Sequence, residues 1–262
     1  MMPLAAVTVG SQLPTTDFDA VVRSVFQHSS NIQLTDGRLA TCTTIDYFDM
    51  PRGIRVDTAQ GFCFASALRA HSSAHCRGGI LRFQASAMKI DLRRAPTWTG
   101  TFAPKTRPSS RLLEDLWWTA LADYPFPLAS CCAAGRHLAE LPSRLIGRGP
   151  GLTPAGDDLL AGRLAAPMLL APGGRSSRTL CRQTRKHLSA TNEISAQMLY
   201  DATHGLFIEP IISFMSALYG NGSVKRAARN LRAVGATSGQ AMLLGVLAGI
   251  VHSENFDLQL RT

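Results

Sequence analysis

The sequence lacks several features that would point to particular classes of protein. No apolar stretch reaches the roughly 18 residues needed to span a bilayer, and the N-terminus lacks the basic start of a secretory signal. We therefore expect a cytoplasmic protein without a membrane anchor. None of the six cysteines belongs to a C-x-x-C pair, which removes the usual zinc-binding and thioredoxin-type patterns.

Charged residues are also few, at 17% of the chain, and acidic residues are the scarcer kind. The 27 Lys and Arg residues exceed the 18 Asp and Glu residues, so the formal net charge is +9. Such an excess can attract nucleic acid or an acidic partner. However, the basic residues are scattered, and no stripe interleaves them with aromatic side chains. We therefore expect a solvated basic surface and no nucleic-acid partner.

The first hundred residues contain many short extended runs between turn residues, which favours a small barrel or sandwich. Asp36-Gly37 between two such runs is a hairpin signal. The Pro/Ser-rich basic stretch at residues 103–111 marks a boundary, and beyond it apolar residues recur at helical spacing. The sequence thus predicts an α+β protein with a β-rich, barrel- or sandwich-like domain at residues 1–104 and a mostly α-helical domain at residues 111–262.

The helical part carries one dense glycine motif, GRGPGLTPAGDDLLAG, at residues 147–162. Thr153 is a good N-cap residue and Pro154 suits the first helical position, so Asp157 and Asp158 fall in the first turn. One interpretation is structural, because carboxylates near a helix N-terminus are stabilised by about 0.3–1 kcal/mol each. The other is functional, because glycines ahead of a helix let a ligand approach the backbone N–H groups.

The motif fits some ligands better than others. Its two carboxylates would repel a phosphate, it has no G-K-[ST] of a P-loop, and its glycine spacing differs from a dinucleotide fingerprint. A small acid that carries an amide meets both demands, since its oxygens can accept from backbone N–H groups and its N–H groups can donate to carboxylates. A carboxylate bound together with Mg²⁺ is the other ligand that fits.

Two further polar clusters precede apolar helical runs. Thr191, Asn192 and Ser195 open one of them, where Thr191 can cap the helix. Thr237 and Ser238 lie between glycines in VGATSGQ, a turn that loosely resembles the first glycine motif. Helix capping alone explains such clusters, and so do hydroxyl and amide contacts to a substrate. Two similar turns can also place two helix starts around one pocket.

The run from Gly147 to Gly162 resembles the signature G-x-G-P-G-L-T-P-[SA]-G-D-D of the AllH-type family. This bacterial family, formerly a domain of unknown function, is linked to purine (allantoin) degradation as a subunit of oxamate carbamoyltransferase. SVFQHSSNIQL, MPRGIRV, TNEISAQML and VGATSGQ resemble further family motifs, so the likeness covers most of the chain. The chain has Ala236 and Gln240 where relatives often carry a His and an acidic residue.

The resemblance implies transfer of a carbamoyl group between oxamate and phosphate, with a small-molecule substrate and other protein subunits as partners. Under this hypothesis Asp157 and Asp158 are catalytic and accept from the substrate amide or hold a cation such as Mg²⁺. Arg148 pairs with a carboxylate or phosphate. The alternative is a non-catalytic subunit that binds a metabolite or scaffolds a multi-subunit complex. The predicted substrate-binding residues are Arg148, Gly149, Gly151, Thr153, Gly156, Thr191, Asn192, Ser195, Thr237, Ser238 and Gly239.

Overall fold

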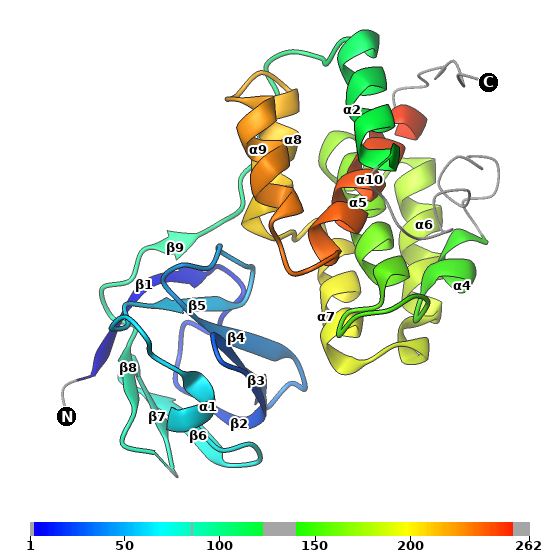
Figure 1. The fold of residues 1–262 in the computed structure, drawn as a ribbon. Coiled ribbons are helices and arrows are strands. Elements are labelled where there is room, and N and C mark those ends of the chain that lie inside the picture. The colour runs from blue at the N-terminus through cyan, green and yellow to red at the C-terminus, as the bar shows by residue number, and fades with distance from the viewer. Residues whose placement is uncertain (1–2, 85, 123–139, 254–262) are drawn as a thin grey trace. The chain divides into compact units, whose positions relative to one another are not determined.

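The structure, a computed structural model, describes residues 3–84, 86–122 and 140–253 (Figure 1). The chain divides into two compact units, Met1–Gly100 and Thr101–Thr262. Within the described residues, the first unit is built of strands with one short helix, and the second is built of helices. The predicted α+β class is therefore confirmed, and the β-rich part is a barrel rather than a sandwich.

The barrel is closed because its first strand pairs on both sides. The elements of this unit are β1 (Leu4–Gly10), β2 (Phe18–Val25), β3 (Ser29–Leu34), β4 (Leu39–Thr44), β5 (Gly53–Val56), α1 (Phe64–Ala67), β6 (Ser73–Arg77), β7 (Ile80–Phe83), β8 (Lys89–Asp91) and β9 (Thr97–Trp98). The strands follow each other in space as β5, β4, β3, β2, β6, β7, β8 and β1, and β1 also pairs with β5. Closure leaves none of these eight strands as an open edge.

Apolar side chains fill the barrel interior and alternate with outward-facing residues along the strands. In β2, for example, Phe18, Ala20 and Val22 are buried, while Asp19 and Val21 between them are exposed. This period of two follows from strand geometry, in which successive side chains point to opposite faces. An eight-stranded barrel is just wide enough for such side chains to fill it, so this interior is a packed core.

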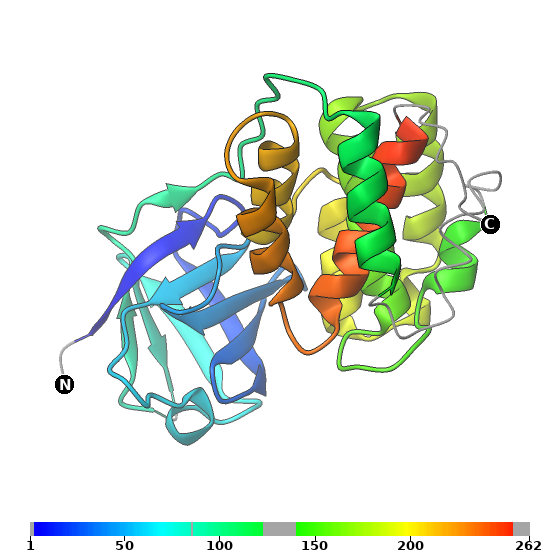
Figure 2. The ribbon, with the colours of Figure 1, turned by 45° about the horizontal axis from the view of Figure 1, so that its top comes forward.

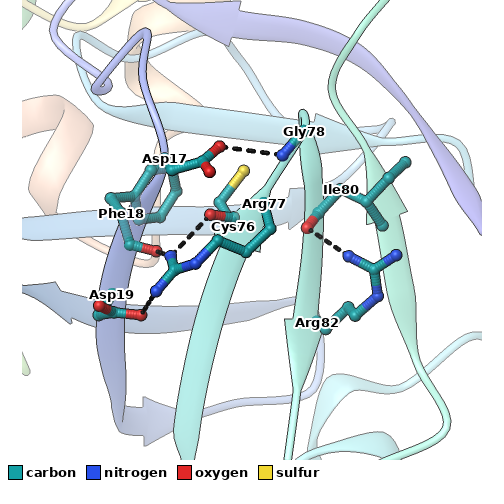
Figure 3. Close-up of polar contacts among 8 residues, drawn as sticks. All are labelled: Asp17, Phe18, Asp19, Cys76, Arg77, Gly78, Ile80 and Arg82. Atoms are coloured by element: carbon teal, nitrogen blue, oxygen red, sulfur yellow. Dashed lines mark hydrogen bonds and ion pairs between the residues drawn. The ribbon is translucent and has the colours of Figure 1, made fainter.

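Polar side chains fix the end of the β2–β6 pair (Figure 3). The Arg77 guanidinium donates to the Phe18 carbonyl oxygen at 2.9 Å and to Asp19 Oδ1 at 2.6 Å. The Gly78 N–H donates to Asp17 Oδ1 at 2.9 Å, which ties the turn after β6 to the start of β2. Because Asp19 and Arg77 are both about half exposed, their ion pair contributes about 0–1 kcal/mol. Burial of the apolar interior is the larger stabilising force.

Two helices form the centre of the second unit. Its described elements are α2 (Ser110–Ala122), α4 (Leu141–Leu145), α5 (Ala155–Leu170), α6 (Arg175–Lys186), η1 (Leu188–Ala190), α7 (Glu193–Ala202), α8 (Glu209–Leu218), α9 (Val224–Arg232) and α10 (Ser238–Ser253). Helices α5 and α10 lie side by side in both views (Figure 1 and Figure 2), and both are buried along most of their length. No helix among the described residues is both long enough and apolar enough to cross a membrane.

Glycines allow α5 and α10 to approach closely. A Cβ atom at Gly245 of α10 would overlap the carbonyl oxygen of Leu159 in α5. Further along, Gly249 of α10 lies against Ala166 of α5. The two helices therefore run in the same direction, and their N-terminal ends lie together.

Replacing Gly245 by Ala should destabilise the helical unit by about 3 kcal/mol, because the new methyl group must push α5 and α10 apart in a packed core. Gly173→Ala is the matched control. Gly173 has a φ of +78° and no atom within 4 Å of the position of a Cβ, so this change should cost only the roughly 1–2 kcal/mol of a left-handed backbone. Urea unfolding followed by circular dichroism measures both. Equal effects of the two substitutions would contradict the close approach of the helices.

Candidate functional site

Asp157 and Asp158 lie in the first turn of α5, as the sequence predicts. The helix begins at Ala155 with Pro154 as its N-cap residue, so the prediction that Thr153 caps it is wrong by one residue. Pro154 is compatible with this position because the fixed φ of its ring also occurs in extended backbone, which Pro154 adopts with a φ of −53° and a ψ of 136°. Its carbonyl oxygen accepts from the N–H groups of the two aspartates at 2.9 and 3.2 Å. The Thr153 hydroxyl instead donates to Asp158 Oδ2 at 3.0 Å.

The glycine loop before α5 is exposed and has a backbone conformation that favours glycine. Gly147, Gly149 and Gly151 have φ values of +74°, +92° and +112°. Among the described residues, no protein group accepts from the N–H groups of Gly149, Gly151 and Leu152. These three amides can therefore donate to the oxygen atoms of a ligand.

Two of the predicted binding glycines use their amides inside the protein. The Gly156 N–H donates to the carbonyl oxygen of Arg148 at 2.8 Å, and a Cβ at Gly156 would overlap the carbonyl oxygen of Leu145. The Gly239 N–H donates to the carbonyl oxygen of Val234 at 2.8 Å. Gly156 and Gly239 therefore allow tight packing at the two helix starts.

Asp157 is completely buried, and both of its carboxylate oxygens accept hydrogen bonds. Oδ1 accepts from the Gly147 N–H at 2.8 Å, and Oδ2 accepts from the Thr191 hydroxyl at 2.5 Å. Burial raises the pKa of Asp157, while the donors Thr191, Gly147 and Ser195 act to lower it. Asp157 thus links the glycine loop and the segment before α7 to the start of α5.

Asp158 is also completely buried, but only one of its oxygens is engaged. Oδ2 accepts from Thr153, whose hydroxyl oxygen lies 3.0 Å from Ser238 Oγ of α10. Oδ1 has no hydrogen-bond partner among the described residues. Burial raises the pKa of Asp158 to about 7; the Ser238 and Thr153 hydroxyls oppose this rise, and Asp157 adds to it. A carboxyl group with such a pKa can give and take a proton near neutral pH.

A third helix, α7, begins beside the aspartates. Asn192 is its N-cap residue, because Oδ1 accepts from two backbone N–H groups of the first turn at 3.1 and 3.0 Å. The prediction that Thr191 caps this helix is therefore wrong, since the Thr191 hydroxyl bonds to Asp157 instead. Asn192 Nδ2 donates to the Leu152 carbonyl oxygen at 2.8 Å. Ser195 is buried and near enough to lower the pKa of Asp157, but its hydroxyl makes no hydrogen bond of normal geometry.

The start of α10 brings the second glycine turn to the first. Ser238 is the first residue of α10, and its hydroxyl meets that of Thr153, which lies 85 positions earlier. The two loosely similar turns therefore lie together at adjacent helix starts. Thr237 is half-buried, and its side chain makes no hydrogen bond within the described part of the chain.

Three helix starts thus converge on the aspartate pair. Gly147, the first glycine of the motif, belongs to this cluster, although it is not among the predicted substrate-binding residues. Its N–H holds Asp157, and a Cβ there would overlap the carbonyl oxygen of Ala190. Arg148 is exposed on the loop, and Thr237 makes no bond to the aspartates. The predicted residues that the structure brings together are Thr153, Asp157, Asp158, Thr191, Asn192, Ser195 and Ser238.

The described residues contain no cluster of side chains that would by itself hold a metal ion. No group of three or more His, Cys, Asp or Glu side chains among them could hold a metal ion. Mg²⁺ requires nearly ideal octahedral coordination by oxygen atoms. In contrast, three of the four carboxylate oxygens of Asp157 and Asp158 already accept hydrogen bonds, and burial favours the protonated form of both side chains.

The raised pKa of Asp158 makes the stability of the helical unit depend on pH. A carboxyl whose folded-state pKa lies above its unfolded value stabilises the fold at low pH. This contribution is lost as the pH rises through the folded-state pKa of about 7. The variant Asp158→Asn lacks this titratable group, because an amide side chain does not gain or lose a proton in this pH range. The free energy of unfolding of the wild type should therefore fall, relative to that of Asp158→Asn, by on the order of 4 kcal/mol between about pH 4 and pH 8.

Urea unfolding at a series of pH values measures this difference. Asp115→Asn, on an exposed position of α2, is the matched control and should keep the pH dependence of the wild type. If the wild type and Asp158→Asn gave parallel stability curves, Asp158 would not titrate in this range.

Two family models match the chain. The model described as the AllH family N-terminal domain matches residues 5–97, and the model described as oxamate carbamoyltransferase subunit AllH matches residues 145–250. The first match covers the barrel strands, and the second covers all three helix starts of the candidate site. No solved structure matches the chain. The family matches on both units show that the chain belongs to the AllH family of oxamate carbamoyltransferase subunits.

Proposed function

We propose that this chain binds the small amide-bearing acid of carbamoyl transfer between oxamate and phosphate, at the glycine loop and the aspartate pair. One observation carries the proposal. Three helix starts converge on the buried aspartate pair, in which Asp158 Oδ1 has no hydrogen-bond partner among the described residues, and a loop whose backbone amides have no protein acceptor adjoins it. An acid that carries an amide needs both kinds of partner at once.

Oxamate has a carboxylate next to an amide. Its carboxylate oxygens can accept from the N–H groups of Gly149, Gly151 and Leu152, close to the positive end of the α5 dipole. Its amide N–H can donate to Asp158 Oδ1, and Ser195 Oγ is a second buried atom without a normal hydrogen bond. Leaving such buried atoms unpaired costs roughly 1–3 kcal/mol each, so a ligand that pairs with them binds more tightly.

Arg148 is the cation best suited to the charge of the substrates. It is exposed on the glycine loop, and it makes no ion pair within the described residues. Arg144, four residues earlier, is already paired with Glu140 at 2.6 Å. A guanidinium without a protein partner can form a bidentate contact to the carboxylate or phosphate of a ligand. The net charge of +9 also favours the approach of anions.

The reaction balances without a cofactor. Oxalurate and hydrogen phosphate give carbamoyl phosphate and oxamate. A phosphate oxygen forms a bond to the carbamoyl carbon, and the bond from that carbon to the nitrogen of oxamate breaks. The nitrogen keeps the electron pair and gains the one proton that hydrogen phosphate loses. For this reaction the chain would supply an anion-binding loop, which orients the substrate, and a carboxyl group that can move the proton.

The family is the basis for the proposed setting of this activity. A subunit of oxamate carbamoyltransferase implies a substrate and further subunits. We therefore propose that the chain works in a multi-subunit complex. From the family resemblance we also propose a role in allantoin and purine degradation in the cytoplasm.

A second candidate function has an observation of its own. Asp157 and Asp158 are completely buried, and three of their four oxygens accept hydrogen bonds from this chain. Such a pair fits a purely structural role, in which it holds three helix starts together. This role would suit a non-catalytic subunit that binds a metabolite or scaffolds its partners. The functional interpretation is preferred because the structural one gives no role to Asp158 Oδ1 or to the open amides of the loop.

Assay of the purified chain with oxalurate and phosphate, alone and assembled with the other subunits, separates the two functions. Turnover by the chain alone would exclude a non-catalytic subunit. Turnover by the assembly that is lost with Asp158→Asn supports the proposed function. Unchanged turnover by an assembly that carries Asp158→Asn would support the non-catalytic subunit instead.

Arg148→Ala should raise the KM for oxalurate or phosphate about 10- to 100-fold in the complete assembly, because a charge-assisted hydrogen bond contributes about 1.5–3 kcal/mol. Steady-state kinetics with each substrate varied in turn measures the change. Arg144→Ala is the matched control, since Arg144 is also exposed but already paired, and it should leave both KM values within about twofold. A similar rise in KM for both variants would mean that only general surface charge attracts the substrates.

A further inference from the structure

The two aspartates are adjacent and equally buried, yet their surroundings differ. Asp157 has a donor on each oxygen, one of them the backbone N–H of Gly147. Asp158 has a donor on one oxygen only, and this donor is the first of two linked hydroxyls. Sequence alone gives both carboxyls the same catalytic role, whereas these contacts distinguish them.

We infer that Asp158 is the sole acid–base group of the pair, that the hydroxyls of Thr153 and Ser238 carry its proton to and from the surface, and that Asp157 is a positioning residue. The inference rests on the proposed function, since it assigns parts of that same site to the steps of carbamoyl transfer.

The proton path is continuous and leads outward. The path has two steps of 3.0 Å each, from Asp158 Oδ2 to Thr153 Oγ1 and from Thr153 Oγ1 to Ser238 Oγ. Each hydroxyl can donate and accept a hydrogen bond. Asp158 is completely buried, while Thr153 and Ser238 are partly exposed. When Asp158 is ionised, Ser238 donates to Thr153 and Thr153 donates to Asp158. When Asp158 is protonated on Oδ2, both hydrogen bonds can reverse their direction, so a proton moves along the path by rotation of hydroxyl groups.

Asp157 also has a hydroxyl donor, that of the partly exposed Thr191, but its other oxygen is held by a backbone N–H. A backbone N–H can only donate, so the Gly147 amide requires an acceptor at Asp157 Oδ1 and cannot relay a proton. Donors on both oxygens stabilise the ionised form of Asp157. Asp157 adds to the rise in the pKa of Asp158, because two adjacent carboxylates in a buried site resist joint ionisation. A single proton shared by the pair therefore belongs on Asp158.

The proton balance of the reaction suits one such group. As the bond between the carbamoyl carbon and nitrogen breaks, the nitrogen leaves with the electron pair and takes the proton of Asp158. The proton that hydrogen phosphate loses then returns to Asp158 through Ser238 and Thr153. In the reverse direction the same carboxylate accepts the proton from oxamate nitrogen. Proton transfer of this kind contributes about 10²–10⁴-fold to a rate.

The identity of the titrating carboxyl is tested on the complete chain without substrate, by infrared spectroscopy of the protonated carboxyl C=O band. We expect a band that disappears with a midpoint near pH 7, is lost in Asp158→Asn and persists in Asp157→Asn. A band that persists in Asp158→Asn, or is lost only in Asp157→Asn, would overturn the assignment. Because this test needs no turnover, it stands even if the assembled enzyme transfers no carbamoyl group.

The proton path is tested by kinetics of the assembled enzyme with oxalurate and phosphate. Thr153→Val keeps the shape of the side chain but removes its hydroxyl, whereas Thr153→Ser keeps the hydroxyl. We expect Thr153→Val to lower kcat about 100-fold with KM within about twofold, and Thr153→Ser to restore kcat. Equal kcat values for the two variants would overturn the path. Absence of transfer by the unaltered assembly would instead contradict the proposed function, and the infrared result would still decide between the aspartates.

Discussion

Two parallel helices can lie as close together as α5 and α10 only where glycines leave the closest contacts without a Cβ atom on one side. Gly162 fits against the carbonyl oxygen of Met242, and Gly245 fits against that of Leu159, positions at which any Cβ atom would overlap the neighbouring backbone. This approach places the two helix starts within hydrogen-bonding distance of each other. The contact between Thr153 and Ser238 depends on it, and so does the sealed environment of Asp158.

That sealed environment has an electrostatic consequence. Two carboxylates removed from water are costly, and the cost falls when donors and helix dipoles face them or when one of them takes a proton. The site uses all three means. Asp157 has two donors, both aspartates lie in the first turn of α5, and the pKa of Asp158 rises to about 7. The same burial that lowers the folding stability thus gives the protein a carboxyl group that titrates near neutral pH.

The sequence predicts the features of this protein that depend on local residue patterns. Alternation of apolar residues indicates strands, helical spacing indicates helices, and glycine and proline mark where α5 begins. Both errors in helix capping are of one residue, because residue preferences define the start of a helix only to within one or two positions. Contacts across the chain could not be predicted in this way. The closure of the barrel through β1 and the bond from Thr191 to Asp157 join segments that are distant in the sequence. Their separation along the chain does not indicate that they pair.

One departure from the family pattern, Ala236, lies close to the proposed proton path at the start of α10. Ala236 is exposed and lies two residues before Ser238, the outer hydroxyl of the proton path. A histidine at this position in a relative would add a group that titrates near neutral pH close to that hydroxyl. Alanine adds none, so in this chain water or a substrate oxygen must exchange the proton with Ser238. The path itself needs only hydroxyls and one buried carboxyl, and therefore tolerates this replacement at its outer end.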